Sequence, residues 1–241
     1  MMLLDEQIKQ LVMVITGTSK GIGYGIANHF LKHGFSVAGC SRGSATITHE
    51  NYFHSVVDIG DENQVRLWIR SVKNHFHRVD VLVCNAGIAP ANLLMTMTPG
   101  KVLIDLLNVN IAGSYFVSRE VSKLMLLQRS GSIITISSMA VGLHEEGTSA
   151  YAASKASIVE MTKIMAKELA PVGITCNILA PSMVVTDAVN ALGEEIIKRA
   201  LSKLTIKRVV TIDEVCNIIS FFAAPESRCI TGQVMHMGLV C

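Results

Sequence analysis

Short apolar runs alternate with longer helical patterns along most of this 241-residue chain, and this alternation limits the fold more than any other feature. The runs are rich in β-branched residues and lack polar alternation, which is typical of strands buried on both faces of a parallel sheet. We expect strands at Leu11–Thr16, Ser36–Cys40, Phe53–Val57, Val79–Cys84, Ser132–Ser137, Ile174–Leu179 and Val234–Met237. We expect helices from a glycine-rich turn to about His33 and over Asp61–Phe76, Pro99–Leu127, Ser149–Ala170, Glu194–Lys203 and Asp213–Ala223. The sequence therefore predicts an α/β fold, a Rossmann-like doubly wound parallel sheet of about seven strands.

The same pattern runs through the chain without a linker, an internal repeat or a low-complexity tract. We therefore expect a single domain over residues 1–241. One connection is unusual, because Ser41–Tyr52 leaves little room for a full helix between the second and third expected strands.

Charge and cysteine usage narrow the class of protein. The formal net charge is +2 with no run of basic residues, so we expect no nucleic-acid partner. No apolar stretch reaches the roughly 18 residues that span a bilayer, and Met1–Glu6 lacks the pattern of a signal peptide, so we expect no membrane contact. The six cysteines form no CxxC pair, which favours reduced thiols in the cytoplasm and no metal site. Only 17% of residues are charged, which suggests apolar surface buried against another subunit.

A glycine-rich turn, Thr16–Gly23, joins the first expected strand to the first expected helix. A dinucleotide pyrophosphate needs backbone that approaches it closely and helix N–H groups that point at it. Gly17 allows the tight turn, Gly21 lets the chain pass near the phosphates, and Gly23 lets the helix pack on the strand. The position of the turn favours cofactor binding over a purely structural role. We expect the site to include Gly17, Ser19, Lys20, Gly21, Ile22 and Gly23.

The residues after the second expected strand indicate which dinucleotide is bound. NAD-binding units often place a carboxylate there, on the adenosine ribose, but this chain has Cys40, Ser41 and Arg42. Arg42 and Lys20 are suited to a 2′-phosphate, so we expect NADP(H) as cofactor. Asp58, next to Ile59 after the third expected strand, is a candidate acceptor for the adenine amine, and a turn-capping role is nearly as well supported.

Tyr151 and Lys155 lie four residues apart in an expected helix and therefore share one face. A free tyrosine titrates near ~10, and a neighbouring ammonium lowers the pKa of a phenol. We expect Lys155 to lower the pKa of Tyr151 and to reach the nicotinamide ribose. This spacing alone is common on helix surfaces and carries little weight.

Ser138 makes the pair more significant, because it follows the fifth expected strand. Ligands of parallel sheets bind beyond the carboxyl ends of the strands, where a hydroxyl can hold a substrate carbonyl. Ser137 is a rival, but alternation along a strand points its side chain the other way. Asn85, Ala86 and Gly87 end the fourth expected strand in the same region and are expected to line the cofactor site.

Together these motifs resemble the short-chain dehydrogenase/reductase family over essentially the whole chain. The matching pieces are Thr16–Gly23, Asn85–Gly87, Asn110, Ser138 and Tyr151 with Lys155. The resemblance implies that Tyr151 is the general acid/base, Ser138 orients the carbonyl and Lys155 anchors the ribose. It also implies that Asn110 holds a water that links Lys155 to solvent. Pro181, Val184 and Thr186, after the sixth expected strand, are implied as cofactor contacts.

Within the family, the chain is most similar to 3-oxoacyl-(acyl-carrier-protein) reductases and acetoacetyl-CoA reductases. The resemblance implies an NADP-dependent oxidoreductase that acts on CH–OH groups and reduces a small keto substrate, with an acyl thioester as one candidate. It also implies a homotetramer or a homodimer. Two departures are Ser182, where the family usually has glycine, and the C-terminal Met237–Cys241.

An apolar, adaptable substrate pocket is expected from several methionines. Its predicted wall consists of Met95, Ser138, Met139, Val141, Leu143, His144 and Met183. Two alternatives stay open: an alcohol, sugar or steroid dehydrogenase working oxidatively, and a non-catalytic NADP(H)-sensing or scaffold protein on the same fold.

Overall fold

A computed structural model describes residues 10–190 and 193–240. The residues that carry the signal-peptide argument, 1–6, and Cys241 lie outside the described residues. Within the described part, seven strands form one sheet in the order β3-β2-β1-β4-β5-β6-β7, and every neighbouring pair is parallel. The predicted doubly wound α/β fold is thereby confirmed.

The strands fall close to their expected positions. Their bounds are β1 Val12–Thr16, β2 Ser36–Ser41, β3 Tyr52–Val56, β4 Val81–Cys84, β5 Gly131–Ile136, β6 Ile174–Ala180 and β7 Val234–His236. The central strands β1, β2, β4 and β6 are buried along their whole length, as their continuous apolar character predicts. The edge strand β3 is only partly buried.

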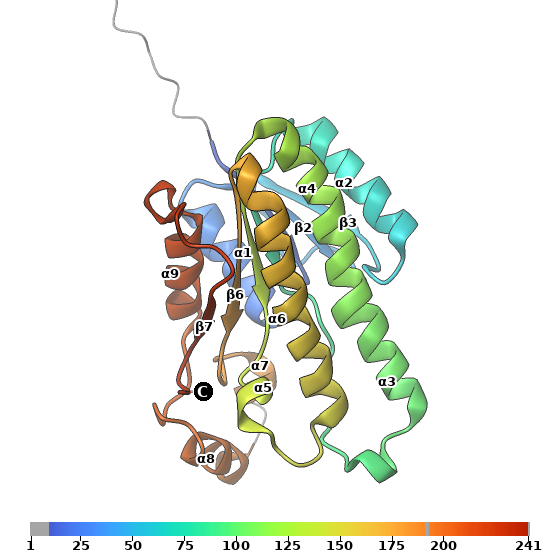
Figure 1. Cartoon of the computed structure of the whole chain (residues 1–241), viewed down its shortest axis with the longest axis vertical. Helices are drawn as coiled ribbons and strands as arrows, with labels where there is room; N and C mark the ends of the chain where they lie inside the picture. Colours follow the sequence, from blue (N-terminus) through green and yellow to red (C-terminus); the bar gives the residue numbers. More distant parts are fainter. Residues whose placement is uncertain (1–9, 191–192, 241) are drawn as a thin grey trace, which may run out of the picture.

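Helices cover both faces of the sheet (Figure 1). One face carries α2 (Glu62–Phe76), α4 (Ser114–Gln128) and α6 (Ser149–Leu169), and the other carries α1 (Gly21–Lys32) and α9 (Ile212–Ala223). Short helices follow the strand ends: α5 (Ala140–Leu143), α7 (Asp187–Asn190) and α8 (Glu194–Ser202). The first two were not expected from the sequence, because runs of four residues carry too little periodicity.

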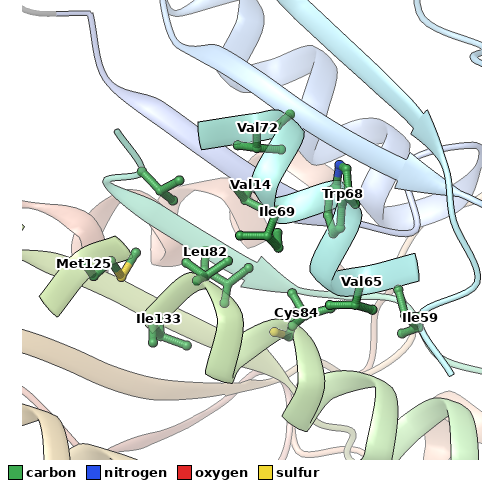
Figure 2. Packing of buried hydrophobic residues seen from close by; sticks show 14 of the residues in the cluster. Val14, Ile59, Val65, Trp68, Ile69, Val72, Leu82, Cys84, Met125 and Ile133 are labelled. Atoms are coloured by element: carbon green, nitrogen blue, oxygen red, sulfur yellow. The ribbon is translucent and has the colours of Figure 1, made fainter. Parts of the chain in front are cut away.

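Two apolar cores lie on opposite faces of the sheet. Figure 2 shows one of them, in which Val65, Trp68 and Ile69 of α2 pack toward Leu82 and Cys84 of β4. The other core holds Phe30 of α1 and Phe222 of α9. Since both faces are buried, the carboxyl edge of the sheet is left for a site.

The predicted helix over Pro99–Leu127 is divided into three parts. The chain forms α3 (Gly100–Leu106), a π-helical segment (Leu107–Gly113) and α4, without leaving the helical region. Such wider turns are rare and occur often at functional sites. No helix forms between β2 and β3, in keeping with the short Ser41–Tyr52 connection.

Candidate active site

A cavity of about 460 Å³ lies at the carboxyl ends of the parallel strands, within the size range of small-molecule sites. It brings together the glycine turn after β1, the turns after β2, β3 and β4, and the ends of β5 and β6. Its lining consists of Gly17, Ser19, Lys20, Gly21, Ile22, Cys40, Ser41, Arg42, Val57, Asp58, Ile59, Asn85, Ala86, Gly87, Ile88, Ala89, Val109, Ile136, Ser137, Ser138, Tyr151, Lys155, Pro181, Ser182 and Asp187.

The glycine turn presents backbone N–H groups to this cavity. Gly17 has φ +78°, which a side chain rarely tolerates, and its N–H donates to the Cys40 carbonyl at 2.8 Å. α1 begins at Gly21, and the preceding Lys20 makes no side-chain capping bond. The first N–H groups of α1 therefore have no side-chain cap at a helix end suited to an anion.

Thr16 joins the turn after β4 to the glycine turn. Its hydroxyl accepts from the backbone N–H groups of Asn85 at 3.0 Å and Ala86 at 2.9 Å. The Asn85 amide donates to the Thr16 carbonyl at 2.9 Å. Gly23 packs behind this junction, where a Cβ would lie 2.3 Å from the Gly17 carbonyl oxygen. Two neighbouring turns of the cavity are thus held in one fixed arrangement.

The outer end of the cavity, after β2 and β3, contains Arg42 and Asp58. Arg42 is exposed, and the β2 end supplies no carboxylate to the lining. Asp58 Oδ1 accepts from the Gly60 N–H at 2.9 Å, so one carboxylate oxygen stabilises the local turn. That bond supports the turn-capping role of Asp58 while its side chain still lines the cavity.

Tyr151 and Lys155, both on α6, face the end of β5. Lys155 is almost fully buried, and its ammonium donates to the Ile136 carbonyl at 2.9 Å. Burial lowers the pKa of Lys155 to about 8. Ser137 donates to the Lys155 backbone carbonyl at 3.1 Å, whereas Ser138 hydrogen-bonds Tyr151. The alternation argument that separated these two serines therefore agrees with the geometry.

The expectation that Lys155 lowers the pKa of Tyr151 is wrong for this geometry. Burial raises the pKa of Tyr151, and the hydrogen bond with Ser138 offsets only part of that rise. The ammonium of Lys155 is engaged by a backbone carbonyl and does not count among the groups that shift the Tyr151 phenol. Tyr151 is consequently held in its protonated form, which suits a proton donor.

Asn110 lies in the π-helical segment and is fully buried. Its Oδ1 accepts from the Ile88 N–H at 2.8 Å, and its Nδ2 donates to the Ile88 carbonyl at 3.1 Å and to Ser154 Oγ at 3.0 Å. One amide thereby joins the turn after β4 to α6, close to Lys155.

Comparison with known proteins places this geometry in a family. Residues 17–238 match a family profile described as enoyl-(acyl carrier protein) reductase. The chain is 33% identical to a 3-oxoacyl-[acyl-carrier-protein] reductase of Staphylococcus aureus (strain Mu50 / ATCC 700699), over 93% of this chain and 95% of that protein. It is 32% identical to a protein of the same name from Vibrio harveyi, over 94% and 95% of the two chains.

The chain belongs to the short-chain dehydrogenase/reductase family. It is therefore an NAD(P)-dependent oxidoreductase that acts on CH–OH groups and uses a nicotinamide cofactor. Among solved structures, one titled "ElxO with NADP Bound" is 30% identical and superposes with a TM-score of 0.87 over 94% of this chain and 96% of that one. A 3-ketoacyl-(acyl-carrier-protein) reductase from Brucella melitensis, complexed with NADH, shares the fold at 24% identity and a TM-score of 0.87 over 94% and 96% of the chains.

Three of the residues expected at the dehydrogenase/reductase cofactor site do not line the cavity. Gly23 lies behind the glycine turn, as described above. Val184 is buried in the core and pairs with Val210, because the chain after β6 turns back against the segment before α9. Thr186 accepts from the Val189 N–H at 3.3 Å and so lies at the start of α7.

Most of the expected substrate wall is also outside the cavity, and only Ser138 lines it. Met95 is 75% exposed in a short 3₁₀ turn after β4. His144 is bonded to the Gly142 carbonyl at 2.9 Å and faces solvent. The residues that do not line the cavity are Met95, Met139, Val141, Leu143, His144 and Met183. They lie near strand ends in the sequence, but neither that position nor apolar composition fixes where side chains point in loops and short helices such as α5.

Several lining residues were not predicted, including Ile88, Val109, Ser182 and Asp187. All but Val109 follow the end of a strand, and that position is a signal that sequence can supply. Ser182 is buried, and its hydroxyl has no hydrogen-bond partner among the described residues.

Over the described residues, no group of three or more His, Cys, Asp or Glu side chains could hold a metal ion. The same residues contain no helix long and apolar enough to cross a membrane.

Proposed function

We propose that this enzyme reduces a keto group to a secondary alcohol with NADPH, and that Tyr151 donates the proton. The observation that carries the proposal is the position of Tyr151, hydrogen-bonded to Ser138 at the end of β5 on the same helix as Lys155. The raised pKa of Tyr151 keeps the phenol protonated near neutral pH, which suits reduction.

The residues of the cavity fit a nicotinamide dinucleotide. The glycine turn and the N-terminus of α1, which has no side-chain cap, would hold the pyrophosphate, and Asn85–Gly87 would flank the nicotinamide half. Arg42 and Lys20 would hold a 2′-phosphate, which favours NADP(H) over NAD(H) because the cavity lining at the end of β2 contains no carboxylate. When bound, the cofactor supplies the hydride.

The chain itself supplies orientation and the proton. Ser138 holds the substrate carbonyl oxygen toward Tyr151, and Tyr151 transfers its hydroxyl proton to that oxygen. Lys155 would anchor the ribose, and it carries positive charge below about pH 8. Asn110 holds the turn after β4 against α6 and, through water, provides a route for proton return.

For the substrate, we favour a 3-oxoacyl thioester, because the relatives named above are 3-oxoacyl-[acyl-carrier-protein] reductases. The exposed apolar side chains of Leu93, Leu94, Met95 and Met97 lie after β4 and are available to an acyl chain. An alcohol dehydrogenase working oxidatively would use the same residues.

A substrate panel in both directions tests this proposal. NADPH and NADH oxidation would be followed with acetoacetyl-CoA, a carrier-bound 3-oxoacyl chain, a 2-enoyl thioester, simple ketones, quinones and keto sugars. We expect the highest kcat/KM with NADPH and a 3-oxoacyl thioester. Preference for NADH, for the enoyl thioester, or for alcohol oxidation by NADP⁺ would overturn the corresponding part. Cofactor binding without turnover on any substrate would favour the sensing alternative.

We also propose a homodimer or homotetramer in the cytoplasm. Large apolar side chains on the segment that runs through α3 and α4, and on α6, are exposed in the single chain. They include Ile104, Tyr115, Leu126, Leu127 and Ile164. Light scattering on the purified protein would give the mass of the assembly, and a monomer at micromolar concentration would contradict this part.

A further inference from the structure

A chain of hydrogen bonds connects the glycine turn to the turn that carries Arg42. Tyr52 Oη lies 2.8 Å from Thr18 Oγ1 and 3.0 Å from His54 Nδ1. His54 Nε2 lies 3.0 Å from the carbonyl oxygen of Gly43. Thr18 is in the glycine turn and Gly43 directly follows Arg42, so the three contacts join the glycine turn to the turn after β2.

The donor and acceptor roles along these hydrogen bonds follow from the groups at the two ends. A carbonyl only accepts, so His54 Nε2 donates to Gly43, and in the neutral ring Nδ1 accepts from the Tyr52 hydroxyl. When the ring is protonated, Nδ1 donates to Tyr52, Tyr52 donates to Thr18, and Thr18 donates to the Cys40 carbonyl at 3.3 Å. With the neutral ring, Tyr52 donates to Nδ1, and the one Thr18 hydrogen can then be donated either to Tyr52 or to the Cys40 carbonyl. Only the protonated ring allows all four contacts at once.

Ser41 also contacts the His54 ring. Ser41 Oγ, on β2, lies 3.4 Å from Nε2 and itself donates to the Gly43 carbonyl at 3.0 Å. Tyr52 on β3 contacts His54 directly, and Cys40 on β2 acts on the Tyr52 phenol. Burial raises the pKa of both Tyr52 and Cys40, which keeps them neutral. Within residues 10–190 and 193–240, His54 forms no ion pair with a carboxylate.

Gly39, the β2 residue that pairs with His54, leaves room for the Tyr52 and Thr18 hydroxyls. A Cβ at position 39 would lie 2.3 Å from Tyr52 Oη and 2.6 Å from Thr18 Oγ1. The space under the outer cavity is thus filled by the Tyr52 and Thr18 hydroxyls.

We propose that His54 is a positioning and specificity residue for the 2′-phosphate of the cofactor. It fixes the turn that carries Arg42 through its hydrogen bond to the Gly43 carbonyl. The affinity for NADP(H) relative to NAD(H) therefore depends on the His54 ring. This inference rests on the NADP(H) preference proposed above.

Direct binding measurements test the inference without turnover. The Kd of NADP⁺ and of NAD⁺ would be measured by calorimetry between pH 6 and 8 on the wild type, His54→Gln and His75→Gln. His75 is the matched control, because it stacks on Phe53 of the same strand from α2. The ratio of the two Kd values removes effects common to both dinucleotides. Titration of the phosphate itself is the same in every variant.

We expect His54→Gln to weaken NADP⁺ binding about 3- to 10-fold at pH 7 and NAD⁺ binding less than about 2-fold. His75→Gln should match the wild type. Equal weakening of both dinucleotides, or unchanged binding of both, would overturn the inference.

A second measurement, made on the wild type alone, tests the inference if His54→Gln fails to fold. Histidine ring resonances of the wild type would be followed by NMR, with His54 assigned through its contact with the Tyr52 ring, 5.9 Å away between centroids. The ring resonances of His54 should shift more on binding of NADP⁺ than on binding of NAD⁺, because the 2′-phosphate is proposed to contact the turn that His54 holds. Equal shifts in the two complexes would contradict the role of His54. A wild-type preference for NAD⁺ would instead refute the proposed cofactor.

Discussion

Lys155 and Asn110 are almost fully buried, whereas Met95, which was expected in the substrate pocket, exposes 75% of its surface. Asn110 makes three hydrogen bonds to Ile88 and Ser154, and Lys155 donates to the end of β5. The segment around Met95 is held mainly by local bonds, with the Thr98 hydroxyl donating to the Leu93 carbonyl at 3.1 Å and the Leu94 carbonyl at 3.0 Å. The residues that support Tyr151 are thus part of the packed fold, whereas the segment that we propose for substrate contact is exposed and can adapt its shape. Substitutions in the two regions should therefore affect different quantities.

The largest effect is expected at Tyr151. Tyr151→Phe removes the donated proton but keeps the ring, so kcat should fall about 10²- to 10⁴-fold. The Kd of NADPH should change little, because the hydroxyl contributes mainly to the chemical step. Steady-state kinetics and fluorescence titration would separate the two quantities. Tyr115→Phe, on the exposed face of α4, is the control and should retain full activity. Near-normal turnover in Tyr151→Phe would refute the role of this residue.

Asn110→Ala should destabilise the fold by about 1–3 kcal/mol, because it leaves the Ile88 N–H without its partner. The turnover number should fall as well, since the turn after β4 is no longer held against α6. Urea unfolding would measure the loss. Asn108→Ala, in the same π-helical segment but exposed, should change the free energy of unfolding by less than about 0.5 kcal/mol. Equal losses in the two variants would show that the segment, not the amide network, matters.

The pH profile tests the burial of Lys155. Its pKa is lowered to about 8, so the ammonium is charged below that pH and neutral above it. We expect kcat/KM for NADPH to be highest below about pH 8 and to fall up to tenfold per pH unit above it. Initial rates between pH 6 and 10 would give the profile. A rate that stays constant to pH 10 would mean that the charge on Lys155 is not needed.

The smallest effect is expected at Met95. Met95→Ala should change the free energy of unfolding by less than about 0.5 kcal/mol, because the side chain is exposed. With acetoacetyl-CoA, kcat should be nearly unchanged, and KM for a longer 3-oxoacyl thioester should rise by about tenfold or less. A large loss of stability would show that the substrate side is as firmly packed as the region around Lys155.

The sequence predicted the buried part of this molecule better than its exposed part. Apolar strands and the Tyr151–Lys155 spacing follow from periodicity, so the sheet and the shared face of α6 were predictable. Strand alternation also separated Ser138 from Ser137. The bonds of Asn110 depend on a π-helical segment, which apolar periodicity does not distinguish from an ordinary helix. Met95 and His144 lie in loops or short turns, where no period orients side chains. Lys155 was expected to act on the pKa of Tyr151, but its bond to Ile136 depends on tertiary geometry.

The most direct test of the account follows the hydride and the proton together. NADPH carrying deuterium at both C4 positions would be incubated with acetoacetyl-CoA and the purified enzyme, and the product would be analysed by mass spectrometry. The account predicts a 3-hydroxyacyl thioester with one deuterium on the carbinol carbon, one NADPH consumed per product, and almost no product with Tyr151→Phe. Bound NADPH without a deuterated alcohol from any keto substrate, or undiminished product with Tyr151→Phe, would contradict it.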